Sequence, residues 1–301
     1  MSARKNLLLT GAHGFVAGSV LTQAGNGWDV HAVSRGDALT QRANLRWHTC
    51  DPLQPAQLAR LFGQLQPQAV IHTAALADID FCQAHPEAAR AVNVGMTHAL
   101  VDLCRDSATR LIFCSTDTVF EGEHAPYQED DPPGPVNFYA ETKVEAEQLV
   151  AQLGAQAVIA RLSLVVGLPV LGAGNSFLAR MLAALSEGRV VPMPANEVRT
   201  PVDAITVGRA LLELAAGPHH GIFHLAGSSR LSRFEMARQI ALRFGLPQDL
   251  IIAQDAAAAP GRARRPRDVS LNNHKARTRL QTPMPTLDEA LSLILELAKR
   301  P

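Results

Sequence analysis

Two residues of this chain, Tyr139 and Lys143, have the types and the spacing needed for proton transfer. On a helix, positions i and i+4 lie on one face about one turn apart. An ammonium group beside a phenol favours the phenolate, so it lowers the tyrosine pKa from its ordinary value of about 10. Such a tyrosine can give a proton to, or take one from, an oxygen atom whose carbon accepts or loses hydride. The pair therefore predicts acid–base chemistry, provided that other elements supply a hydroxyl and a cofactor site.

The hydroxyl is expected just after an apolar strand at residues 110–114. Thr116 at this strand end is placed to hold a carbonyl oxygen beside the tyrosine. Ser115 is its rival, and sequence position alone does not decide between them. Asp117 and Thr118 come next, and we expect them to hydrogen-bond a polyhydroxylated substrate.

A glycine-rich segment follows the first apolar run of the chain, residues 6–10, and leads into helical periodicity. Between a strand and a helix, glycines let the backbone approach a pyrophosphate, and the amides at the helix N-terminus meet its charge. The spacing is G-x-x-G-x-x-A rather than G-x-G-x-x-G. We predict a dinucleotide phosphate site from these residues: Gly11, His13, Gly14, Phe15 and Val16.

The end of the second strand, at about residues 29–34, bears on the choice of cofactor. An acidic residue there binds a ribose 2′-hydroxyl, whereas a basic residue accommodates a 2′-phosphate. The chain has Ser34 and Arg35 at this point, with Asp37 two places further on. We therefore predict NADP(H), with NAD(H) as the second possibility. After the third strand, Cys50 and Asp51 are expected to bind the adenine end, with Asp51 accepting from the amino group.

Strand and helix patterns alternate through the first half of the chain. Strands are predicted at residues 6–10, 29–34, 45–49, 69–73, 110–114 and 157–162, and helices at about 15–24, 55–65, 87–107 and 138–153. This alternation predicts an α/β fold with a doubly wound parallel Rossmann sheet, which binds ligands at the carboxyl ends of its strands. The predicted cofactor set is completed by Thr73, Ala74, Ala75, Ser115, Leu162, Tyr139 and Lys143.

The alternation stops near residue 165. We expect a dinucleotide-binding domain at 1–165 and a smaller mixed α/β substrate-binding domain at 166–301, with about 200–225 returning to the Rossmann sheet. Arginines in this half are candidates for gripping a diphosphate, because guanidinium pairs bidentately with phosphate oxygens. The acidic, proline-rich segment 121–135 is predicted to be a solvated surface loop. The substrate-binding candidates of the second half are Asn175, Arg199 and Arg265, the last within a run that also contains Arg262, Arg264 and Arg267.

Composition restricts the remaining possibilities. The 301 residues include 28 basic and 28 acidic side chains, so no net charge points to nucleic acid or to a membrane surface. The four cysteines are scattered, which favours reduced thiols and a cytoplasmic protein. The eleven histidines show no metal-ligand spacing, so no metal site is expected.

Together, these motifs resemble the extended short-chain dehydrogenase/reductases, and most closely their dTDP-4-dehydrorhamnose reductase (RmlD-like) group. The resemblance extends over nearly the whole chain and is most specific in its first 165 residues. One departure is Thr118, which stands where the group has an aromatic residue in S-T-D-Y-V-F. The matching segments are Thr10 to Val16, Asp51, His72 to Ala75, Ala91 to Val94, Ser115 to Phe120, Pro126 to Glu129, Tyr139 with Lys143, and Arg265-Pro266.

The resemblance implies an NADP(H)- or NAD(H)-dependent reductase of a keto-sugar that is linked to a nucleotide. Thr116, Tyr139 and Lys143 then correspond to the group's catalytic triad. Tyr139 is the general acid, Thr116 orients the carbonyl oxygen, and Lys143 lowers the tyrosine pKa and binds the nicotinamide ribose. Thr118 leaves the identity of the sugar open.

Two other functions remain open from the sequence. One is a nucleotide-sugar epimerase or dehydratase, or another carbonyl reductase, of the same superfamily. The other is a regulatory subunit that binds NADP(H) without turnover. A homodimer through helices at about 87–107 and 139–153 is a further possibility that the sequence does not decide.

Overall fold

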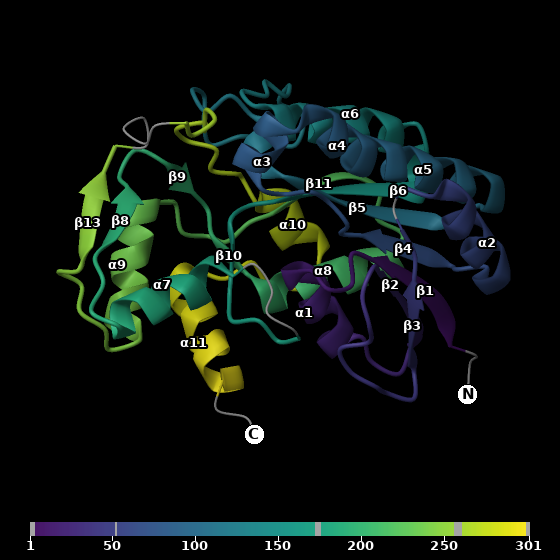
Figure 1. Ribbon diagram of the computed structural model, residues 1–301, viewed down its shortest axis with the longest axis horizontal. Helices are drawn as coiled ribbons and strands as arrows, with labels where there is room; N and C mark the ends of the chain where they lie inside the picture. The colour runs from purple at the N-terminus through teal and green to yellow at the C-terminus, as the bar shows by residue number, and fades with distance from the viewer. Residues whose placement is uncertain (1–3, 52, 172–175, 256–260, 299–301) are drawn as a thin grey trace.

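A computed structural model describes residues 4–51, 53–171, 176–255 and 261–298 of the chain. Its central element is a seven-stranded sheet with the strand order β11-β6-β5-β4-β1-β2-β3 (Figure 1). Every neighbouring pair in this sheet is parallel, which confirms the predicted doubly wound α/β fold. Its strands are β1 (Lys5–Thr10), β2 (Trp28–Ser34), β3 (Leu45–Thr49), β4 (Ala69–His72), β5 (Arg110–Thr116), β6 (Ala157–Leu162) and β11 (Gly221–Leu225).

Helices cover both faces of this sheet, which explains why its strands read as continuous apolar runs. On β1, Leu7 and Leu9 face one core, whereas Leu8 faces the other. The first face is covered by α1 (Phe15–Gln23) and α8 (Ala204–Ala216), with α10 (His274–Arg279) beside them. The second face is covered by α2 (Pro55–Leu65), α5 (Met96–Ser107) and α6 (Phe138–Ala151).

A second group of elements lies beside the sheet and has a core of its own (Figure 1). Its helices pack against a two-stranded parallel sheet of β8 and β13. α8 joins the two groups, because it packs against α1 on the first face of the large sheet while its residue Ile205 packs in the second core. The remaining elements are β7 (Val165–Val166), α7 (Phe177–Ser186), β8 (Val191–Pro194), β9 (Val198–Arg199), β10 (Val202–Asp203), β12 (Leu231–Ser232), α9 (Arg233–Arg243), β13 (Ile251–Gln254) and α11 (Leu287–Ala298).

The helix predicted at about residues 87–107 is confirmed as one continuous helical stretch, but it contains a π-helical turn. It consists of α4 (Pro86–Arg90), a π-helical turn (Ala91–Gly95) and α5, and it is preceded by α3 (Ile79–Ala84), which was not predicted. The apolar periodicity runs through these residues without showing the wider π turn. α3 is a single short helix ending before Pro86, too short for periodicity to reveal it.

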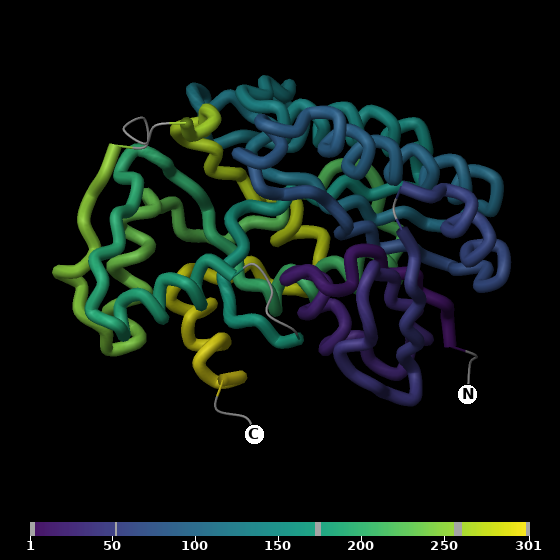
Figure 2. Tube along the Cα trace, viewed as in Figure 1, coloured from purple at the N-terminus to yellow at the C-terminus, as the bar shows by residue number. Residues whose placement is uncertain are grey.

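The segment 121–135 is a loop whose residues are mostly exposed or half-buried, as predicted, but Tyr127 within it is buried. Tyr127 is only 3% exposed, and its ring stacks on Phe120 with centroids 4.1 Å apart. The Tyr127 hydroxyl accepts hydrogen bonds from the backbone amides of residues 122–124. The backbone of Tyr127 pairs with that of Leu271, in a late segment that runs back from the second group towards the sheet (Figure 2). Tyrosine burial therefore anchors the loop between the two groups.

None of the helices in the described ranges combines the length and the apolar character that crossing a membrane would require.

Candidate functional site

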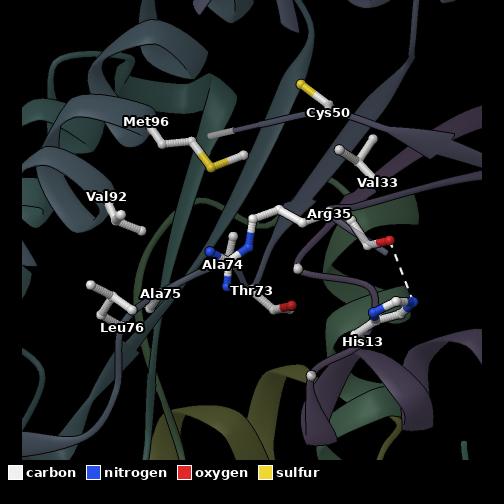
Figure 3. A pocket seen from close by; sticks show the side chains of 13 residues that line it. His13, Val33, Arg35, Cys50, Thr73, Ala74, Ala75, Leu76, Val92 and Met96 are labelled. Atoms are coloured by element: carbon white, nitrogen blue, oxygen red, sulfur yellow. Dashed lines mark hydrogen bonds between the residues drawn. The ribbon is translucent and has the colours of Figure 1, made fainter. Parts of the chain in front are cut away.

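A cavity of about 410 Å³ opens at the carboxyl ends of β1, β2 and β4, where the dinucleotide site was predicted (Figure 3). It brings together residues separated by more than sixty positions in the chain, because parallel strands end at one edge of the sheet. The predicted cofactor residues in its wall are Gly11, His13, Gly14, Ser34, Arg35, Cys50, Thr73, Ala74 and Ala75.

The floor of the cavity depends on Gly11. Its φ of +70° lies in the left-handed region, and a methyl group at this position would lie 2.7 Å from the backbone N and Cα of Ala74. The turn closes with a 2.7 Å hydrogen bond from the Gly14 amide to the Gly11 carbonyl. Gly14 is the N-cap of α1 and has no side chain to cap it, so the first-turn amides remain available to an anion. Phe15 and Val16 follow as the first two residues of this helix.

The basic residue predicted to select the cofactor is part of the cavity. Arg35 is exposed, and Figure 3 shows its side chain directed into the cavity. No aspartate or glutamate is among the described lining residues. The Ser34 hydroxyl donates to the Gly36 carbonyl at 2.9 Å, and His13 Nε2 is 2.7 Å from the Asp37 carbonyl oxygen. These bonds hold the turn after β2 and leave the Arg35 guanidinium facing the cavity.

Several predicted cofactor residues lie outside this cavity. The Asp51 carboxylate accepts from the Leu53 amide at 3.0 Å and so stabilises its own turn. Leu162 ends β6 and is 8% exposed within the core below α1 and α8. Of the described residues, those predicted for the cofactor but absent from the cavity wall are Phe15, Val16, Asp51, Ser115, Tyr139, Lys143 and Leu162.

Four apolar residues of the cavity wall were not predicted: Val33, Leu76, Val92 and Met96. On the sequence they are indistinguishable from core residues, because apolar side chains at helix and strand positions are normally buried. Val92 and Met96 are four residues apart across the π-helical turn, a spacing that would have placed both on one face of a helix.

The Thr116, Tyr139 and Lys143 side chains come from β5 and the first turns of α6. Asn137 caps α6, accepting a hydrogen bond from the Ala140 amide at 3.0 Å, and this fixes where the helix begins. Tyr139 is 9% exposed, and its phenol meets the Thr116 side chain. The Ser115 hydroxyl is buried and has no hydrogen-bond partner in the described chain. The two rival hydroxyls thus point to different surroundings, and Thr116 is the one beside the tyrosine.

Lys143 is bound to β5. Its Nζ donates to the Cys114 carbonyl at 2.7 Å and lies 4.1 Å from the centre of the Phe113 ring. Burial lowers the pKa of Lys143 to about 8. The ammonium is therefore held against the C-terminal part of β5, two residues before Thr116 in the chain.

The tyrosine pKa is shifted in the direction opposite to the sequence prediction. Burial raises the pKa of Tyr139 well above its ordinary value, and the charges of Asp117 and Cys82 add to that rise. The hydrogen bond with Thr116 acts in the other direction but is weaker. Burial dominates because it removes water from the phenolate. Near neutral pH the phenol is protonated, which is the form that a general acid requires.

Asp117 and Arg199, both predicted to bind substrate, meet each other. Asp117 is 4% exposed and Arg199 is 6% exposed, and Arg199 Nε lies 3.7 Å from Asp117 Oδ2. Thr118 is 8% exposed, with its hydroxyl 3.0 Å from the Thr116 hydroxyl. These side chains form a buried polar cluster beside the tyrosine.

Arg265 is engaged elsewhere. It pairs bidentately with Asp80 of α3, with N–O distances of 2.7 and 2.8 Å. The Asp80 carboxylate also accepts from the Ala263 amide, and Asn137 donates to the Arg264 carbonyl. Arg265 therefore ties the late loop to α3 and α6 in this structure. Asn175 lies outside the described residues.

Asn93, in the π-helical turn, belongs to the site but was not predicted as a site residue. Its amide nitrogen donates to the Leu76 carbonyl at 3.1 Å and to the Thr142 hydroxyl at 3.0 Å, and its oxygen accepts from the Leu76 amide at 2.8 Å. One buried side chain thus joins the cavity wall at Leu76 to the helix that carries Tyr139. The segment Ala91 to Val94 was noted for its resemblance, which was the available signal.

Comparison with known proteins agrees with this geometry. The family model described as "RmlD substrate binding domain" matches residues 5–299. The chain belongs to this family. This confirms the resemblance to the RmlD-like group that was inferred from the motifs.

Individual relatives of this RmlD-like chain have two different kinds of name. It is 30% identical to "Probable low-salt glycan biosynthesis reductase Agl14" of Haloferax volcanii, over 82% of this chain and 83% of that protein. It is 29% identical to "Methionine adenosyltransferase 2 subunit beta" of Bos taurus, over 91% of this chain and 82% of that protein. The family therefore contains proteins named as reductases and proteins named as subunits of another enzyme.

The fold of the chain is also that of solved RmlD-like structures. A dTDP-4-dehydrorhamnose reductase from Bacillus anthracis, solved in complex with NADP, superimposes with a TM-score of 0.87. The match covers 98% of this chain and 100% of that chain, at 20% sequence identity. At this identity the likeness concerns the fold.

Proposed function

We propose that the chain is an NADP(H)-dependent reductase of a sugar keto group, with a nucleotide-linked sugar as substrate. The observation that carries the proposal is the meeting of Thr116 and Tyr139 beside a glycine-lined cavity that has an arginine and no carboxylate in its described wall. Membership of the RmlD-like family and the reductase named among its relatives support it.

The cavity fits a dinucleotide for reasons internal to the chain. A side chain on Gly11 would clash with the backbone of Ala74, and α1 begins without a side-chain cap. Arg35 supplies a positive charge for a 2′-phosphate, so NADP(H) is the preferred cofactor and NAD(H) the second possibility. When bound, the nicotinamide supplies hydride to the substrate carbon.

The proton is the contribution of the chain itself. The Tyr139 phenol, protonated at neutral pH, donates to the carbonyl oxygen, and Thr116 holds that oxygen in place. Lys143, whose Nζ donates to the Cys114 carbonyl at 2.7 Å, is assigned to the nicotinamide ribose. The second group of elements, with Arg199 at its edge, then forms the substrate-binding domain, and Arg199 is placed for the phosphates. Thr118 contacts the sugar.

Oxidation of NADPH with a panel of carbonyl compounds, including dTDP-4-keto-sugars, tests this proposal. Tyr139→Phe removes the general acid and keeps the ring, so we expect kcat/KM to fall roughly 100-fold or more. The affinity for NADPH should stay within a factor of about three, because Tyr139 does not line the described cavity wall. Unchanged turnover in Tyr139→Phe would remove the tyrosine from the mechanism.

A second candidate function is a cofactor-binding subunit without turnover. It is favoured by the 29% identity to a methionine adenosyltransferase subunit and by the position of Lys143, whose ammonium donates to the Cys114 carbonyl. Tight NADPH binding without oxidation of NADPH by any carbonyl compound would support it. An epimerase or dehydratase would instead convert the sugar with no net consumption of cofactor.

A further inference from the structure

Asp117 was expected to hydrogen-bond the sugar, but the structure gives it a different set of contacts. It follows β5 in a single 3-10 turn, and its side chain is almost completely buried. A carboxylate accepts hydrogen bonds and donates none, so each neighbour has to direct a hydrogen towards it. The donors around Asp117 come from three separate parts of the chain.

One carboxylate oxygen faces the catalytic hydroxyl. Thr116 Oγ1 donates to Asp117 Oδ1 at 3.3 Å and accepts from the Thr118 amide at 3.2 Å. The Thr118 hydroxyl lies 3.0 Å from the same Thr116 oxygen. Asp117 and Thr118 are therefore the two side chains that orient the Thr116 hydroxyl, and of the two only Asp117 carries a charge.

The other oxygen faces the second group of elements. Ser163, just after β6, donates to Asp117 Oδ2 at 3.2 Å, and Arg199 Nε lies 3.7 Å from the same atom. Ser163 in turn accepts from the Thr200 amide and hydroxyl, each at 3.3 Å. The Thr200 hydroxyl accepts from the Leu271 amide at 3.1 Å. A continuous chain of polar contacts thus runs from the reacting hydroxyl to the strand that carries Arg199.

We propose that Asp117 is a positioning residue that couples the anion-binding arginine Arg199 to the catalytic hydroxyl of Thr116. This inference rests on the proposed reductase function and deepens it. Asp117 holds Thr116 with one oxygen and neutralises Arg199 with the other, without touching the sugar. When a substrate phosphate binds Arg199, the ion pair between Arg199 and Asp117 weakens. The hydrogen bond between Asp117 and the Thr116 hydroxyl then changes in strength.

Asp117 also belongs to the electrostatic surroundings of Tyr139. The charged and titratable groups around the phenol are Asp117 at the end of β5, Cys114 within β5, Cys82 on α3, and Lys143 on α6 itself. The Asp117 charge raises the Tyr139 pKa, second in size only to burial. Removing this charge should therefore lower the Tyr139 pKa.

Asp117→Asn tests the proposal, because it removes the charge and keeps the shape. We expect kcat to fall at least about tenfold while KM for the sugar substrate changes by less than about threefold. Affinity for dTDP, measured by calorimetry, should increase several-fold, because Arg199 is no longer neutralised. A raised KM with unchanged kcat would mean direct contact with the sugar and would overturn the proposal.

Ser163→Ala is the matched control. It removes one donor to the same carboxylate oxygen and leaves the charge in place. We expect kcat within about threefold of the parent chain. Equal losses of kcat in Ser163→Ala and Asp117→Asn would mean that packing, not charge, matters here, and would overturn the proposal.

Two further measurements keep the proposal testable. If Asp117→Asn does not fold, as judged by its melting curve and NADPH binding, Arg199→Gln approaches the same pair from the other side. It should lower kcat at saturating substrate as well as dTDP affinity, whereas weaker binding with unchanged kcat would refute the coupling. If the parent chain turns over no substrate, the reductase proposal fails, but the dTDP comparison still decides whether Asp117 neutralises Arg199.

Discussion

Replacing Gly11 by alanine is the most direct test of how the cavity is built. The added methyl would lie 2.7 Å from the Ala74 Cα and N, a distance at which backbone has to move. The φ of +70° adds a conformational penalty of about 1–2 kcal/mol for any residue with a Cβ. Overpacking of this kind costs about 1–3 kcal/mol. Together we expect Gly11→Ala to lower the free energy of unfolding by about 2–5 kcal/mol.

The same displacement should weaken the cofactor site. The methyl stands between the glycine turn and the end of β4, so the N-terminus of α1 shifts relative to the cavity wall. If the strain favours a distorted cofactor site over the binding-competent one by about 1.4 kcal/mol, NADPH should bind about tenfold more weakly. Urea denaturation measures the stability, and fluorescence titration with NADPH measures the affinity.

Gly25→Ala is the matched control, because no atom lies within 4 Å of its added methyl and its φ is not in the left-handed region. It should change stability by less than about 0.5 kcal/mol and leave NADPH affinity unaltered. If Gly11→Ala unfolds at the same urea concentration as Gly25→Ala and binds NADPH equally well, the close approach of Gly11 to Ala74 is not required. The unfolding measurement stands whether or not the chain is a reductase.

Two further predictions concern the cofactor and pH. Arg35→Ala should weaken NADPH binding much more than NADH binding, by about tenfold or more, because a guanidinium pairs with the 2′-phosphate that only NADPH carries. Arg60→Ala is the control, because Arg60 is exposed on α2 outside the cavity wall. Equal losses of affinity for NADPH and NADH in Arg35→Ala would contradict the assignment. Burial lowers the pKa of both His72 and His224 to about 3, from an ordinary value of 6.5. The unfolded chain therefore binds more protons between those values, and the free energy of unfolding should decrease as pH is lowered from about 6.5 to about 3. Urea denaturation across this range measures it, and a stability that stays constant would mean that these histidines are not held neutral.

The relation between sequence and structure is clearest in the first half of the chain. Its parallel strands are buried on both faces, so each appears as an apolar run, and the helices between them are long enough to show their periodicity. The rule that such sheets bind ligands at strand ends was then sufficient to gather Gly11, Arg35 and Thr73 into one cavity. These residues of the cavity wall could therefore be predicted from local sequence patterns and one topological rule.

The sequence could not give the second group of elements in the same detail. The strands β7, β9, β10 and β12 contain only two residues each, too few for any alternation to appear. Their pairing depends on partners far along the chain, such as Leu231 with Arg199. The anchoring of Tyr127 against Phe120 likewise depends on a fold that a proline-rich, acidic segment does not reveal.

What the sequence determined by itself is the set of candidate groups: the glycine turn, Arg35, the Tyr139 and Lys143 pair, and a hydroxyl at the end of β5, either Ser115 or Thr116. The tertiary structure decided their electrostatics. Spacing brings Lys143 within one turn of Tyr139, but only the packed fold directs its ammonium to the Cys114 carbonyl and buries the phenol beside Asp117. Burial and charge pairing depend on every segment that surrounds a group, and those segments meet only when the chain folds.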